Sequence, residues 1–140
     1  MSLAVFLVES VGAPRNHHAL FVRSNGNDGH LFQVTGNIQE GMIYESKETP
    51  APQLSAEYYG MQQIGWVSSS SLERLDAICR SNPPPEKQFD GPRRTDPRKP
   101  LRRCQEWTAE TIELIREKGV LRPVCDSIPR LSTQGIVETK

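Results

Sequence analysis

Short apolar segments separated by turn residues dominate the first half of the chain. Residues 3–9 are apolar and partly β-branched, and Gly12-Ala13-Pro14 ends this run. Residues 17–23 and 30–35 are two further runs of this kind, and the residues between them are rich in Gly and Asn. Two strand-like runs joined by such a cluster predict a β-hairpin. Weaker strand candidates are residues 42–45 and 62–67.

The pattern becomes helical at Ser68. Ser70 and Glu73 have the spacing of a capping box, and a short apolar stripe follows them, which predicts a helix within residues 68–81. Residues 104–119 show the clearest helical periodicity, and Gly119 stands where a left-handed cap belongs. Helix 68–81 is expected to stop at the prolines that begin at position 83, because proline lacks the amide hydrogen.

The remaining segments are predicted to lack regular structure. Residues 82–103 contain six prolines and are interpreted as an ordered loop that wraps the domain. Residues 120–140 are expected to form an irregular tail anchored by Ile128 and Leu131. Strands within residues 1–67 followed by two helices indicate the α+β class, with a small antiparallel sheet packed against the helix that carries Cys104. The length of 140 residues suits a single domain over residues 1–140.

Charge and hydropathy argue against nucleic-acid and membrane functions. Lys plus Arg and Asp plus Glu both number 17, so the formal net charge is zero and general attraction to anionic polymers is not indicated. The basic excess is confined to residues 87–103, with seven basic and two acidic side chains, and Phe89 is the only aromatic there. The longest apolar run, residues 3–8, is far shorter than the ~20 residues of a spanning helix. It also lacks the preceding basic segment of a secretory signal.

The number and spacing of the cysteines indicate a cellular compartment and limit the expected chemistry. Three cysteines without a signal peptide indicate a reducing, cytoplasmic setting with free thiols. No two of them have the C-x-x-C spacing of a zinc site, and no phosphate-binding or dinucleotide-binding glycine motif occurs. The chain is therefore expected to use no metal and no cofactor.

Cys104 is the best candidate nucleophile. It falls in the first turn of the strongest predicted helix, where unpaired amide hydrogens favour a thiolate, and Arg102 and Arg103 directly precede it. The alternative is that Cys104 is a small buried side chain facing the sheet. That alternative suits Cys79, at the end of its helix, and Cys125, in the tail.

A cysteine nucleophile needs a base, and the chain offers only three histidines. His17 and His18 open a strand and point to opposite faces, so periodicity alone does not choose between them. His30 follows a glycine at the loop end and is expected to be exposed. Gln33 interrupts an apolar strand, so its amide either orients the base or faces solvent.

Two of these motifs resemble a known family. His17-His18-Ala19-Leu20-Phe21-Val22 resembles the H-W-A-L-[FY]-V strand of circularly permuted papain-like proteins, which include NlpC-type and lecithin retinol acyltransferase-like enzymes. Arg103-Cys104-Gln105-Glu106-Trp107 resembles their N-C-x-x-[FHW] helix start. Residues 29–36 and the Pro-rich approach to Cys104 are also similar to small uncharacterised fungal proteins of this type.

The resemblance implies a role for each matched residue. Cys104 would be the nucleophile, His17 the base and Gln33 the third member, which is usually His in that family. His18 replaces the usual aromatic residue of the strand motif. The implied activity is hydrolysis of, or acyl transfer from, an amide or ester in a small-molecule or peptide substrate.

Substrate contacts and partners follow from the same reading. The residues expected at the substrate are Arg102, Arg103, Trp107 and His18, and paired arginines suit a carboxylate or phosphate. The alternative is a catalytically inactive relative that binds a protein partner through the basic loop 87–103.

Overall fold

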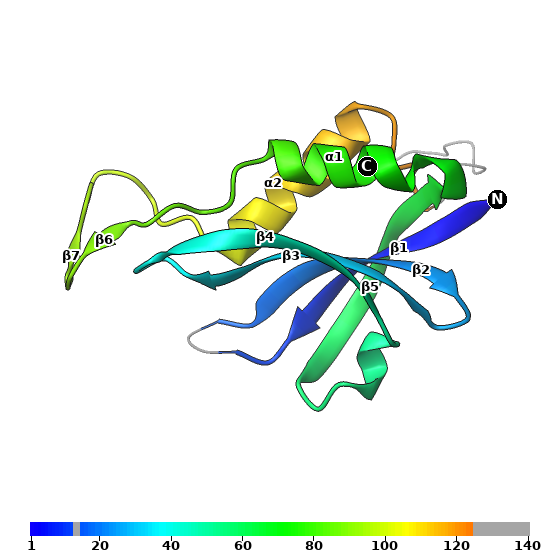
Figure 1. Ribbon diagram of the computed structural model, residues 1–140, viewed down its shortest axis with the longest axis horizontal. Coiled ribbons are helices and arrows are strands. Elements are labelled where there is room, and N and C mark those ends of the chain that lie inside the picture. The colour runs from blue at the N-terminus through cyan, green and yellow to red at the C-terminus, as the bar shows by residue number, and fades with distance from the viewer. Residues whose placement is uncertain (13–14, 125–140) are drawn as a thin grey trace, which may run out of the picture.

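The computed structural model describes residues 1–12 and 15–124, and it is an α+β fold (Figure 1). Five antiparallel strands form one sheet in the order β4-β3-β2-β1-β5. The α+β class expected from the sequence, with an antiparallel sheet packed against the helix that carries Cys104, is therefore confirmed. The strands are β1 (Ser2–Ser10), β2 (His17–Asn25), β3 (Asp28–Asn37), β4 (Gly41–Thr49) and β5 (Tyr58–Ser68).

A tight turn connects β2 to β3. The predicted hairpin is β2 and β3, and its turn is shorter than expected because β2 extends to Asn25 and β3 begins at Asp28. Gly26 in this turn has φ of 63°, a conformation that glycine adopts at little cost. Strands β4 and β5 are also longer than their sequence patterns indicated, since cross-strand pairing extends them into residues of mixed polarity.

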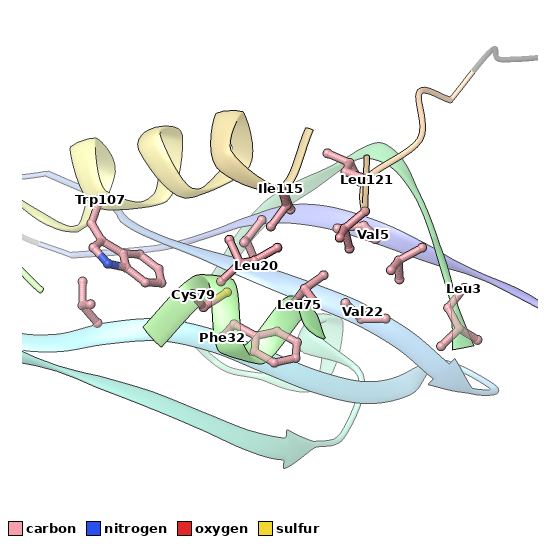
Figure 2. Packing of buried hydrophobic residues seen from close by; sticks show 14 of the residues in the cluster. Leu3, Val5, Leu20, Val22, Phe32, Leu75, Cys79, Trp107, Ile115 and Leu121 are labelled. Carbon is pink, nitrogen blue, oxygen red and sulfur yellow. The ribbon is translucent and has the colours of Figure 1, made fainter. Parts of the chain in front are cut away.

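Both helices lie on the same side of the sheet (Figure 1). They are α1 (Leu72–Ser81) and α2 (Cys104–Glu117), and a core forms between them and the alternate apolar residues of the strands. Figure 2 shows Trp107 and Ile115 of α2 above Leu20 of β2, with Leu75 of α1 beside them. All four side chains are fully buried, so α2 is firmly seated on the sheet.

The predicted end of α2 is confirmed, whereas the predicted start of α1 is wrong in its capping. Gly119 follows α2 with φ of 73°, and Val120 donates its amide hydrogen to Ile115, as in a left-handed helix cap. The predicted capping box of α1 does not form. Instead, Ser68 accepts the amide hydrogen of Ser70 and caps a preceding 3-10 turn, η2 (Ser69–Ser71). A second such turn, η1 (Pro52–Leu54), lies between β4 and β5.

The Pro-rich segment between the helices contains more structure than predicted. Strands β6 (Phe89–Asp90) and β7 (Arg93–Arg94) form a small hairpin, where no regular structure was expected. Gly91 makes its turn with φ of 63°. The hairpin projects beyond the sheet (Figure 1). Neither strand contains a proline, so the prolines of this segment did not prevent pairing.

The chain after α2 returns to the sheet. Arg122 and Trp66 of β5 exchange backbone hydrogen bonds of 2.9 Å in each direction. The predicted tail anchors Ile128 and Leu131, and also Cys125, lie outside the described residues. No helix within residues 1–12 and 15–124 is long and apolar enough to cross a membrane.

Candidate functional site

The site lies where two neighbouring strands separate. Pairing between β2 and β3 ends at Leu20 and Phe32, whereas β2 stays paired with β1 as far as His17, and β3 stays paired with β4 as far as Asn37. The first residues of β2 therefore have one free backbone edge, and the start of α2 occupies it. Thr108 of α2 donates to the carbonyl of His18 at 3.4 Å.

Cys104 is the first residue of α2 and faces this edge. Cys104 and His17 line the same pocket. Burial raises the pKa of the thiol, but the His17 and His18 hydrogen bonds and the charge of His17 outweigh burial and lower the pKa below its ordinary value. The first-turn amide groups of α2 lack intrahelical partners and add to the positive potential.

A chain of polar side chains continues from His17 away from the cysteine. His17 Nε2 lies 2.8 Å from Gln33 Oε1, and Gln33 Nε2 donates to Glu45 Oε1 at 2.7 Å. Gln33 is 7% exposed, and it lies directly opposite Glu45 in the β3–β4 register. The polar strand residue predicted from the sequence is therefore buried, and both its amide oxygen and its amide nitrogen have a partner.

The order of these bonds sets the tautomer of His17. The ionised carboxylate of Glu45 only accepts hydrogen bonds, so the amide nitrogen of Gln33 must face it and the amide oxygen must face His17. An oxygen acceptor requires a hydrogen on His17 Nε2. In the neutral ring Nδ1 then carries the lone pair, which is the form that can take a proton from Cys104. The Cys104 hydrogen bond raises the pKa of His17, burial opposes it, and Gln33 adds to the increase.

A pocket opens beside the cysteine and the histidine. Its volume is about 340 Å³, at the small end of the range for small-molecule sites. Apolar side chains and two arginines share its wall with the nucleophile. The lining residues are Gly12, Arg15, His17, Gly36, Asn37, Ile38, Gln39, Met42, Arg103, Cys104 and Gln105.

The predicted substrate-contact residues divide into two groups. Arg103 lines the pocket, whereas Arg102, Trp107 and His18 do not. Trp107 is fully buried in the core. Arg102 directly precedes Arg103 in the sequence, but its guanidinium binds Glu110 with contacts as short as 2.7 Å. The side chain of His18 lies 3.7 Å from Glu9, so only its backbone reaches the site.

The other candidate groups are placed elsewhere. Cys79 is fully buried, and burial raises the pKa of its thiol to about 12, in accord with the structural role expected for it. His30 lies 3.8 Å from Glu48 of the edge strand and is only partly exposed, whereas the sequence predicted an exposed side chain.

Sequence reasoning missed Glu45 and Arg15. Glu45 ends one of the weaker strand candidates, and only the strand register shows that it faces Gln33. Arg15 lies in the connection before β2 and carries no local motif. Neither position has a signal in the sequence that would have distinguished it from other surface charges.

Comparisons with known proteins identify a family without an assigned activity. Neither the curated proteins nor the solved structures contain a match to this chain. One family model, described as a family of unknown function (DUF6540), matches residues 5–122, which include every residue of the site described above. The chain belongs to this family, DUF6540.

Proposed function

We propose that the protein is a cysteine-dependent hydrolase or acyltransferase that acts on an amide or ester through an acyl-enzyme. The observation that carries this proposal is that Cys104 and His17 line one pocket, with the His17 ring hydrogen-bonded to Gln33. A lowered thiol pKa beside a raised imidazole pKa is the pattern expected of an activated cysteine. By contrast, Cys79 has the raised pKa of an inert buried thiol.

The chemistry follows from these positions. His17 Nδ1 takes the proton of Cys104, and the thiolate attacks the carbonyl carbon of the substrate. The first-turn amide groups of α2 donate to the oxygen that becomes negative. His17 then returns the proton to the departing amine or alcohol, leaving a thioester on Cys104. Water or another acceptor loses a proton to His17, attacks the thioester, and regenerates the thiol.

The order of elements supports a circularly permuted papain-like plan for this site. The strand that carries His17 precedes the helix that carries Cys104, and the third polar residue comes from the next strand, β3. An amide in the third position can orient an imidazole, as asparagine does in papain-type sites. Gln33 meets that requirement because Glu45 accepts a hydrogen bond from the Gln33 amide nitrogen, which leaves the amide oxygen facing the His17 ring.

The alternative of a binding module that uses the basic loop 87–103 has less support. Two of the arginines in that loop are engaged within the chain, since Arg94 donates to the carbonyl of Lys99 and Arg102 pairs with Glu110. The ion pair with Glu110 offsets the charge of Arg102, and the contact with Lys99 holds the Arg94 guanidinium within the loop.

Thiol reactivity tests the proposal directly. Cys104 should react with iodoacetamide near neutral pH well before Cys79, as measured by peptide mapping after brief labelling. His17→Ala should abolish this advantage, because the thiolate then loses its cationic partner. His18→Ala and His30→Ala are matched controls that should preserve it, since the backbone amide of position 18 remains and His30 lies elsewhere.

Acyl transfer is tested with an activated ester. Incubation with 4-nitrophenyl acetate should give a burst of nitrophenol and an acetyl group on the peptide that contains Cys104. Equal labelling of Cys79 and Cys104 in the first experiment, or no dependence on any histidine, would contradict the catalytic proposal. The loop 87–103 would then be the feature to pursue.

A further inference from the structure

The pocket beside Cys104 has a one-sided charge distribution. Arg15 and Arg103 both line it, and among the described residues no Asp or Glu does. Neither guanidinium forms an ion pair with a described carboxylate. Two unpaired cations therefore share a small pocket with the nucleophile, although the net charge of the chain is zero.

Neighbouring acidic groups offset the charge of this pocket only in part. Glu106 is the nearest in sequence, and its carboxylate accepts the backbone amide hydrogen of Arg103 at 2.7 Å. That bond holds the carboxylate at the start of α2, outside the pocket lining. Glu110 is similarly committed to Arg102. The charge of Glu106 still acts on Cys104, where it works toward a higher thiol pKa, but neither arginine of the pocket is paired with a described carboxylate. Positive charge is therefore left for a ligand.

The rest of the wall limits what that ligand can be. Ile38 is 5% exposed and Met42 is partly buried, so aliphatic surface also faces the pocket. A volume of about 340 Å³ suits a small acyl group better than a long lipid chain or a folded partner. Planar guanidinium groups recognise carboxylates by paired hydrogen bonds.

We propose that the acyl group delivered to Cys104 carries a free carboxylate, which Arg103 and Arg15 bind while Ile38 and Met42 contact its aliphatic part. This inference rests on the proposed function, because it names the substrate class of the same site. Arg103 is adjacent to the nucleophile, so it should contribute more than Arg15, which is exposed and lies in the connection before β2. Arg102 takes no part.

A pair of alkylating reagents tests the charge preference without requiring a known substrate. Iodoacetate and iodoacetamide are nearly the same size, and both lose iodide to the thiolate, but only iodoacetate carries a carboxylate. The readout is the ratio of their rates at Cys104, divided by the same ratio for glutathione. Any effect of a substitution on the thiol pKa cancels in this ratio.

The wild-type protein should favour iodoacetate by about five- to tenfold over glutathione at low ionic strength, with the preference falling as salt screens the charges. Arg103→Gln should remove most of the preference and Arg15→Gln a smaller part. Arg93→Gln, on the exposed hairpin away from the pocket, is the matched control for net charge and should leave the ratio unchanged.

The outcomes separate this inference from the proposed function. A wild-type ratio equal to that of glutathione, or an equal loss in Arg93→Gln and Arg103→Gln, overturns the carboxylate preference even if Cys104 still reacts near neutral pH well before Cys79. If neither reagent modifies Cys104 faster than it modifies a free thiol, and the rates do not depend on His17, the proposed function is overturned as well.

Discussion

Replacing Gln33 by methionine should weaken the activation of Cys104 while leaving the fold intact. Methionine has nearly the same length and volume, so Gln33→Met removes the amide without opening a cavity. His17 then loses its acceptor at 2.8 Å. Glu45 loses its donor, but its side chain is 41% exposed and water can replace the bond.

The size of the effect follows from the lost bond to a charged ring. Hydrogen bonds to charged groups contribute ~1.5–3 kcal/mol, and the lower value suits a half-buried histidine. Since 1.36 kcal/mol corresponds to one pKa unit, the apparent pKa for forming the thiolate and imidazolium pair should rise by about one unit. Alkylation should therefore slow about tenfold on the acidic side of the wild-type midpoint. The two proteins should converge at alkaline pH, where both thiols are ionised.

The assay is the rate of Cys104 alkylation by iodoacetamide against pH, followed by mass spectrometry, after circular dichroism has shown an unchanged fold. Gln62→Met is the matched control, because Gln62 is exposed on β5 and outside the pocket lining. A midpoint in Gln33→Met that moves by less than about half a unit would refute the orienting role of the amide. A loss of reactivity that persists at alkaline pH would indicate structural damage instead.

Two further substitutions test the surroundings of the site. Glu45→Ala should slow alkylation of Cys104 near neutral pH by about threefold, because the Gln33 amide is then free to turn, and the exposure of Glu45 limits the effect. Lys47→Ala, whose ammonium lies 3.7 Å from the same carboxylate, should change that rate less than twofold by the same measurement; equal losses would contradict the tautomer argument. Arg102→Met should lower the free energy of unfolding in urea by about 1 kcal/mol, since it breaks the pair with Glu110. The pH midpoint of Cys104 alkylation should not move in that variant. A shifted midpoint would indicate that Arg102 acts on the site after all.

Local patterns were sufficient for much of the fold. Alternating apolar residues and turn residues predicted each of the five main strands, because strand and turn preferences act over a few neighbouring residues. The start of α2 at Cys104 and the cap at Gly119 follow from the same kind of short-range signal. The expected hairpin of β2 and β3 also formed, with a tighter turn.

Predictions failed where the chain had a second hydrogen-bonding arrangement available. The capping box at Ser70 and Glu73 was displaced by a cap from Ser68. Prolines in residues 82–103 argued against strands, yet β6 and β7 pair around Gly91, since a two-residue strand avoids the prolines altogether. Strand lengths were underestimated because pairing, rather than side-chain alternation, determines where a strand ends.

The sequence by itself placed a cysteine at a helix start and two adjacent histidines at a strand start, but it left the choice between the histidines open. That choice depends on the separation of β2 from β3, which admits the start of α2 and brings Cys104 against the His17 ring and the backbone of His18. Glu45 is likewise far from Cys104 in sequence and reaches the site only through strand register. Strand propensity and capping act within one turn or a few residues, so the sequence can report them. Contacts between strands and helices depend on how distant segments pack, and only the tertiary structure decides them.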